Sequence, residues 1–253
     1  MSTRPTTRPT TRPSSQPGSP PASPPGTVLL SGIVGSTAYG LAHAGSDIDR
    51  LGLFAAPTEG FHGLHRPAES HVSTRPDRTL HEAAKWCRLA LGCNPTATEL
   101  VWLPDELYEV RDPLGEELIA IRRSFLSARG VRNAYLGYAT QQFRKLLTRD
   151  TADPVTRARA AKHARHLVRL LEQAVHLHEV GHNQVRLPDP ERVRGLGERI
   201  ADDPAHAEGL LAAATDRLDR PGVLPEHPDE RPAEAWLRRV RAVHWTPEPV
   251  SAA

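Results

Sequence analysis

The amino-acid sequence predicts an α/β (α+β) protein, in which a small sheet domain with flanking helices is followed by a mostly helical domain. Two observations carry this expectation. Short segments rich in Leu and β-branched residues, bounded by Pro and Gly, occupy residues 27–34 and 47–56 and predict buried strands. Longer segments with helical apolar spacing fill the second half and open with Asp-Pro pairs at Asp112 and Asp153, a helix-start signal.

The 253 residues divide into four predicted segments. Residues 1–26 are rich in Pro, Thr and Arg and offer almost nothing that can be buried, so we expect a disordered tail. The sheet domain follows at 27–111 and the helical domain at 112–245, with shorter helices expected from about Pro188 onwards. Residues 246–253 are expected to form a frayed end.

Composition narrows the classes of partner and location. A formal net charge of +2 and a pI near 8.7 permit a nucleotide or nucleic-acid partner without demanding one. Cys87 and Cys93 form no CxxC pair and no signal peptide is evident, which favours a reducing, cytoplasmic location. No apolar segment approaches the length of a membrane span, so we expect no membrane partner.

Two further helices are predicted between the strands and the second half. Segment 77–92 ends at Gly92, a plausible C-cap. Its apolar residues share one helical face: Leu80, Ala84, Cys87 and Leu91. Segment 94–103 restarts a helix, in which Thr96 and Glu99 have the spacing of a capping box.

The stretch GSTAYGLAHAGSDIDRLGLF, residues 35–54, contains the residues best suited to chemistry. Asp47 and Asp49 stand two positions apart at the predicted second strand, so their carboxylates point to one face and can share a divalent cation. Mg²⁺, with Mn²⁺ as the alternative, suits carboxylates completed by water and phosphate oxygens. Gly35 and Ser36 form an upstream turn whose N–H groups can approach a triphosphate. Ordinary turn chemistry is the alternative explanation.

A strand, then Gly-Ser, then D-I-D entering a second strand is a pattern that resembles the polymerase-β-like nucleotidyltransferase superfamily. Within it, the chain is similar to predicted nucleotidyltransferases related to a group linked with bacterial and phage RNA repair. The likeness covers about residues 28–190. It includes DRTLHEAAKWCRLALGCNPTATELVWLP, NAYLGYATQQFRKLL and KHARHLVRLLE, at residues 77–104, 133–147 and 162–172.

This resemblance implies a small mixed sheet and a third carboxylate, Asp77, on a later strand. Asp77 would complete the metal site and accept the proton of an attacking hydroxyl; a loop that ends in a helix N-cap is the alternative. The implied reaction is in-line attack on the α-phosphate of a nucleoside triphosphate, with release of pyrophosphate. An RNA end is the first expected acceptor, ahead of a protein hydroxyl or a small molecule. The chain departs from the superfamily in lacking a helix before the first strand.

Basic residues on the predicted helices are the remaining candidates for nucleotide binding. Lys162, His166 and Arg169 are spaced by four and then three residues and form a stripe that can face a triphosphate or a nucleic-acid backbone. Lys145 has a similar setting. A solvated helix face is the alternative. The candidate nucleotide-binding residues are Gly35, Ser36, Lys145, Lys162 and Arg169.

Two other functions remain open from the sequence. A nucleotide-binding or antitoxin-like partner protein would keep the fold with little turnover. The segment HEVGH, residues 178–182, matches the signature of zinc peptidases, which requires both histidines on one continuing helix. Gly181 lies inside this segment, where the helix is expected to stop, which disfavours a peptidase.

Overall fold

The computed structural model describes residues 26–147 and 153–246. The predicted tail, apart from Gly26, and the predicted frayed end, apart from Thr246, lie outside the described residues.

The described residues contain a five-stranded sheet in the order β3-β4-β2-β1-β5. β2 and β4 run parallel, whereas the other neighbouring strands are antiparallel, so the sheet is mixed, as expected. The strands are β1 (Thr27–Val34), β2 (Asp49–Ala55), β3 (Ser70–Thr74), β4 (Asp77–Glu82) and β5 (Tyr108–Arg111).

Both strands predicted from their apolar sequence are present, but the second begins later than predicted. β2 starts at Asp49, and Asp47 lies in the loop before it. The two aspartates therefore do not share one strand. This loop contains a turn at Gly45, which adopts a φ of +88°, and Asp47 lies outside the hydrogen-bonded ladder of the sheet.

The prediction of a single helix over residues 77–92 is wrong. Residues 77–82 form β4, because they pair along β2 from Arg50 with Arg78 to Phe54 with Glu82. The helix α2 (Ala83–Leu91) begins only after Glu82, whose carboxylate accepts a hydrogen bond of 2.8 Å from the N–H of Ala84. Gly92 follows α2 as the C-cap, as predicted.

The capping box predicted for the next helix is also wrong. The helix α3 (Pro95–Leu100) is capped by Asn94, whose side-chain oxygen accepts from the N–H of Ala97 at 3.1 Å. Glu99 is buried and contacts other elements instead of the helix start.

The second half is helical, as expected. Asp112 and Asp153 cap α4 and α6 through the N–H groups of Gly115 and Thr156, at 2.7 and 2.8 Å. The later helices have 13 or 14 residues, against 27 in α6, which agrees with the shorter helices predicted there. These helices are α4 (Pro113–Ala120), α5 (Ala128–Leu147), α6 (Pro154–Val180), α7 (Pro190–Asp202), α8 (Ala205–Leu218) and α9 (Glu230–Val243). Short 3-10 helices are η1 (Thr58–Phe61), η2 (Asp105–Leu107) and η3 (Arg122–Phe125).

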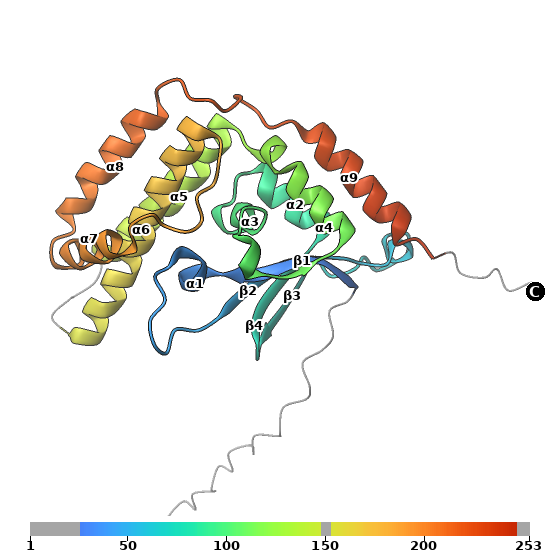
Figure 1. Cartoon of the computed structure of the whole chain (residues 1–253), viewed down its shortest axis with the longest axis horizontal. Helices are drawn as coiled ribbons and strands as arrows, with labels where there is room; N and C mark the ends of the chain where they lie inside the picture. Colours follow the sequence, from blue (N-terminus) through green and yellow to red (C-terminus); the bar gives the residue numbers. More distant parts are fainter. Residues whose placement is uncertain (1–25, 148–152, 247–253) are drawn as a thin grey trace, which may run out of the picture.

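Helices cover one face of the sheet, and a helical bundle stands beside it (Figure 1). α2, α3 and α4 pack on the sheet, and α9 lies across α2 and α4. α5, α6, α7 and α8 pack on one another beside the end of the sheet that carries the short helix α1 (Gly35–Tyr39). One main core runs through both parts and includes Leu53, Trp86, Leu118 and Leu167. The division into domains at residue 111 stays a prediction.

Within the described ranges, none of the helices combines the length and the apolar character that a bilayer crossing requires.

Candidate functional site

The end of β1 and the beginnings of β2 and β4 meet at one edge of the sheet. Val34, the last residue of β1, pairs with Asp49, the first of β2. Arg50 pairs in parallel with Arg78, so Asp49 and Asp77, one residue earlier in each strand, are neighbours across the two strands. Since side chains alternate along a strand, both carboxylates belong to the face that Leu51 turns toward the helix-covered core. We call Asp47, Asp49 and Asp77 the acidic edge.

Gly35 allows the chain to turn closely past this edge. Its φ is +69°, a region that residues with a Cβ adopt only under strain. A Cβ at this position would collide with the carboxylate of Asp49. The absence of a side chain at Gly35 thus lets α1 begin directly beside Asp49.

The electrostatics of Asp49 tie the acidic edge together. Burial raises the pKa of the Asp49 carboxyl above its ordinary value, and the charges of Asp77 and Asp47 raise it further. The charge of Lys162 acts in the opposite direction. Asp47 and Asp77 themselves are exposed. The Asp49 carboxylate is partly desolvated and repelled by two others, and a bound cation would offset both effects.

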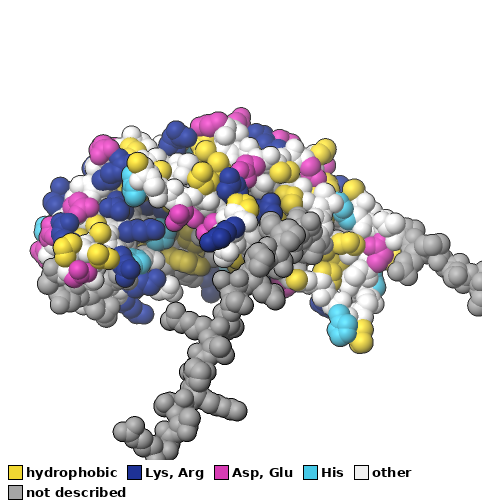
Figure 2. Space-filling model, turned by 90° about the horizontal axis from the view of Figure 1, so that it is seen from below, with side chains coloured by type: hydrophobic (Ala, Val, Ile, Leu, Met, Phe, Trp, Pro, Cys, Tyr) yellow, Lys and Arg dark blue, Asp and Glu magenta, His cyan; other side chains and the backbone are white. Residues whose placement is uncertain are grey.

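A cleft of about 510 Å³ separates the acidic edge from α5 and α6. One side is formed by the turn and two aspartates: Gly35, Ser36, Asp47 and Asp49. The opposite side, which we call the basic wall, is formed by side chains of α5 and α6: Lys145, Lys162, His163, Arg165, His166 and Arg169. Figure 2 shows Lys and Arg side chains gathered over the part of the molecule that α5–α8 form, beside a hollow.

The cleft brings together all five predicted nucleotide-binding residues and two of the three predicted metal-binding aspartates. Asp77 does not line the cleft but stands beside Asp49 at its edge. No three His, Cys, Asp or Glu side chains within the described ranges are close enough to enclose a metal ion by themselves. Mg²⁺ does not require such an enclosure, because one or two carboxylates suffice when water and phosphate oxygens complete its coordination.

Arg169 is the most buried member of the basic wall, since only 2% of the residue is exposed. Its guanidinium stacks over the ring of Tyr39 at 4.1 Å and pairs with the carboxylate of Glu99 at 3.7 Å. It also donates to Gln173 Oε1 at 2.6 Å. The expectation that this residue belongs to a solvated face is therefore excluded.

Tyr39 and Glu99 were not predicted as site residues from the sequence, yet Tyr39 lines the cleft and contacts the buried Glu99 behind it. The Tyr39 hydroxyl donates to Glu99 Oε2 at 2.7 Å. Burial raises the pKa of Glu99 to about 7, against the opposing effects of Arg169, Tyr39 and the Gly35 backbone N–H. In the sequence, Glu99 is an acidic residue within an apolar segment, with capping-box spacing from Thr96, and neither feature identifies its partners.

Residues 21–214 match the sequence model of a protein family described as RlaP, RNA repair pathway DNA polymerase beta family. The chain belongs to this family. The match spans the acidic edge and both helices of the basic wall, and it confirms the polymerase-β-like resemblance seen in the sequence. No curated protein matches the chain.

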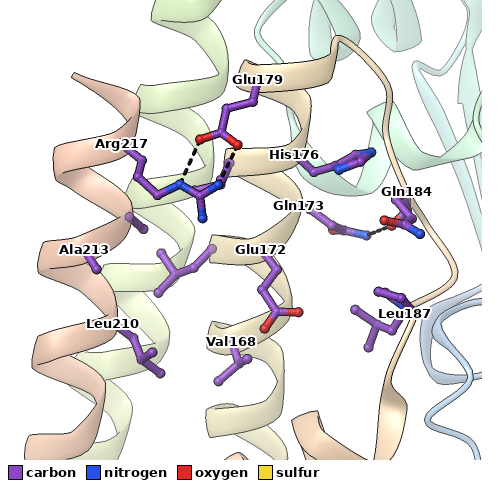
Figure 3. A pocket seen from close by; sticks show the side chains of 14 residues that line it. Val168, Glu172, Gln173, His176, Glu179, Gln184, Leu187, Leu210, Ala213 and Arg217 are labelled. Carbon is purple, nitrogen blue, oxygen red and sulfur yellow. Dashed lines mark hydrogen bonds and ion pairs between the residues drawn. The ribbon is translucent and has the colours of Figure 1, made fainter. Parts of the chain in front are cut away.

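A second cavity lies away from the acidic edge, between α6, α8 and the segment that precedes α7 (Figure 3). Its volume is about 390 Å³, and Val168, Leu187 and Leu210 contribute apolar surface to it. The charged side chains that line it form ion pairs. Arg217 donates twice to Glu179, at 2.8 and 2.5 Å, and Glu172 pairs with Arg192, which lies outside the lining. Because these groups pair with one another and do not converge on the cavity, the cleft at the acidic edge is the better candidate for the functional site of this RlaP-family protein.

The HEVGH segment does not form a peptidase site in this member of the RlaP family. α6 ends at Val180, and Gly181 follows as a left-handed C-cap, as the sequence predicted. His178 Nε2 lies 2.8 Å from the carbonyl oxygen of Arg220, while the ring of His182 packs on Trp102. With Glu179 paired to Arg217, the three motif residues face different partners.

Proposed function

We propose that the protein is a nucleotidyltransferase that moves a nucleoside monophosphate from a nucleoside triphosphate to a hydroxyl acceptor. The observation that carries this proposal is the placement of the acidic edge and the basic wall on opposite sides of one cleft. A polyanionic substrate that arrives with a cation needs both kinds of surface at once. Membership of a polymerase-β-like family supports the same activity.

The acidic edge fits a divalent cation. Asp47, Asp49 and Asp77 offer hard oxygen donors, and the pKa of Asp49 is raised first by burial and then by the charges of Asp77 and Asp47, which a cation would offset. One or two of these carboxylates for each ion, completed by water and phosphate oxygens, would hold Mg²⁺, or Mn²⁺ in its place. When bound, the cation would stabilise the negative charge of the phosphate oxygens during transfer.

The basic wall would hold the triphosphate. Lys162 is close enough to Asp49 to affect its pKa, so its ammonium group is suited to a phosphate bound between the two sides. Lys145 adds a second cation from α5. Ser36 lies at the start of α1, where a backbone N–H without a helical partner can donate to a phosphate oxygen, and Gly35 allows the chain to turn closely at this point.

In the proposed reaction, the acceptor hydroxyl oxygen forms a bond to the α-phosphorus, and the bond between that phosphorus and the bridging oxygen breaks. Pyrophosphate leaves, and Asp77 accepts the proton of the attacking hydroxyl. Asp77 is suited to this task because it is exposed at the edge beside Asp49, where an acceptor can reach it. An RNA end is the first acceptor to test, before a protein hydroxyl and a small molecule.

The proposal is tested by transfer of α-labelled nucleotides, each of the four supplied separately with Mg²⁺ or Mn²⁺, to total RNA and to the protein itself. Wild type is compared with Asp47→Asn and Asp49→Asn, and with Asp216→Asn as a control, since Asp216 is an exposed residue of α8. We expect wild type and the control to transfer label equally and the two acidic-edge variants to lose transfer. Binding of triphosphate by folded wild type, without transfer to any acceptor, would instead indicate the partner-protein function.

A further inference from the structure

The basic wall contains a histidine whose protonation is set by its neighbour. His166 Nδ1 lies 3.0 Å from Nη2 of Arg169. A guanidinium nitrogen donates hydrogen bonds and does not accept them, so His166 Nδ1 must be the acceptor. The neutral ring therefore carries its single proton on Nε2.

Arg169 is itself held in place by a chain of hydrogen bonds that leads back to the protein backbone. Gln173 Nε2 donates to the carbonyl oxygen of Gln184 at 3.3 Å, an interaction visible in Figure 3. Gln173 Oε1 accepts from Arg169 Nη1 at 2.6 Å. A carbonyl only accepts and a guanidinium only donates, so the two ends fix the orientation of the Gln173 amide. With Tyr39 stacked on it and Glu99 paired to it, the guanidinium has no freedom to turn away from His166.

The other ring nitrogen of His166, Nε2, is the hydrogen-bond donor of the neutral ring. Among the residues that the structure describes, no partner contacts His166 Nε2, and the ring lines the cleft. Burial, followed by the charges of Arg169, His163, Lys145 and Lys162, lowers the pKa of His166 to about 3. The ring is thus a neutral donor set among cations, and it keeps one direction for its N–H throughout the physiological pH range.

We propose, on the basis of the proposed nucleotide site, that His166 is a phosphate-binding residue whose Nε2–H donates to a phosphate oxygen of the bound triphosphate. Arg169 then acts as a positioning residue that fixes the tautomer. This division of labour differs from the sequence-based expectation, in which Arg169 contacts the nucleotide. The lysines of the basic wall supply charge without strict direction, whereas the imidazole N–H supplies a donor at one defined point.

The test uses two substitutions that separate the donor from the bulk of the ring. In His166→Asn, the amide oxygen replaces Nδ1 as acceptor for Arg169, but no donor remains at the position of Nε2. In His166→Gln, the amide reaches that position and restores a donor. Binding of magnesium tripolyphosphate, a probe without base or sugar, is measured by calorimetry. We expect His166→Gln to bind within about threefold of wild type and His166→Asn to bind about ten- to a hundredfold more weakly, as for loss of a hydrogen bond to a charged group.

The tautomer is measured on wild-type protein by nitrogen NMR with labelled histidine, which requires no variant. We expect His166 to be protonated on Nε2 and bare on Nδ1 from about pH 5 to about pH 8. His163 provides an internal reference, because its Nδ1 faces the side-chain oxygen of Gln142 at 2.7 Å and should carry the proton.

Three results would overturn the inference: a proton on His166 Nδ1, wild-type affinity in His166→Asn, or equal weakening in both variants. If wild type transfers nucleotides while one of these results is found, the proposed function stands and only the role of His166 fails. If wild type binds neither tripolyphosphate nor any of the four nucleoside triphosphates, both proposals fail together.

Discussion

Gly35 controls the approach of α1 to Asp49, and its substitution separates two effects of a side chain. Gly35→Ala places a Cβ in the left-handed region and against the Asp49 carboxylate. Gly45→Ala imposes the same kind of backbone strain at φ +88°, but its Cβ would meet open space. We expect each variant to lose about 1–2 kcal/mol in the free energy of unfolding, and only Gly35→Ala to lose nucleotide transfer.

Urea unfolding and the transfer assay measure the two effects on the same preparations. Equal transfer by the two variants would show that contact with Asp49 is unimportant and that Gly35 serves only the backbone.

The buried carboxyl of Glu99 leads to a prediction about how the free energy of unfolding depends on pH. Burial raises its pKa from the ordinary value of 4.5 to about 7. The folded protein holds this proton more tightly than the unfolded chain, so the stabilisation is full below about pH 4.5 and is lost as the pH rises toward 7. We expect the contribution of Glu99 to the free energy of unfolding to fall by up to about 1.4 kcal/mol per pH unit in this window.

Glu99→Gln provides the comparison, because the amide oxygen still accepts from Tyr39 and has no carboxyl proton to lose. Unfolding free energies are measured at several pH values between about 4.5 and 8. The variant should show a flatter pH dependence than wild type, and parallel curves for the two proteins would refute the assignment.

The residues of the candidate site differ in how far the sequence predicts them. Gly35, Ser36, Asp47 and Asp49 lie within one short stretch, so a local pattern was enough to find them. The contact between Tyr39 and Glu99 joins positions 60 residues apart, and each side chain alone resembles an ordinary core or cap residue. Such contacts arise only when α3 and α6 pack against α1, so a local sequence pattern does not predict them.

At the level of elements, the sequence signals that the structure confirms are those that depend on contacts between residues close together in the sequence. Asp112 and Asp153 cap helices that begin at the next residue, because a side-chain oxygen needs only an N–H three positions later. Segment 77–82 failed for the opposite reason. Its spacing suits a helix, but parallel pairing with β2 satisfies its backbone and buries Leu80 on the other face of the sheet, with Phe54.

The cap of α4 yields an element-level prediction. Asp112→Ala removes the acceptor for the N–H of Gly115 and should lower the free energy of unfolding by about 1 kcal/mol. Asp112→Asn keeps a good capping oxygen and should remain close to wild type. Thermal unfolding followed by circular dichroism measures both. If the two variants are destabilised equally, the charge of Asp112, and not its capping bond, supports this helix.

At the level of the whole molecule, the cleft depends on contacts that hold the helical bundle against the sheet. Arg194 of α7 donates to the carbonyl oxygens of Gly40 and Ala42, at 3.0 and 3.4 Å. The N–H of Leu187 donates to the carbonyl oxygen of Tyr39 at 3.2 Å. These bonds fasten the chain just after α1 to the bundle, so the two sides of the cleft are positioned before any substrate arrives. A binding site that is largely formed in advance loses less free energy to ordering when its ligand binds.

This arrangement has a consequence for stability, because the same carboxylates that suit a cation repel one another without it. Asp49→Asn removes a charge whose pKa is raised by burial and by Asp77 and Asp47, so the variant should be at least as stable as wild type near pH 7 in the absence of ligand. With magnesium and nucleoside triphosphate at about 100 times Kd, wild type should gain about 2.7 kcal/mol. The variant should gain little, while Asp216→Asn on α8 should behave like wild type in both conditions.

Urea unfolding with and without ligand tests whether the order of stability of wild type and Asp49→Asn reverses when the ligand is added. If Asp49→Asn is less stable than wild type without ligand, Asp49 stabilises the fold. The predicted reversal would instead show that the Asp49 carboxylate destabilises the free protein and stabilises the ligand-bound one.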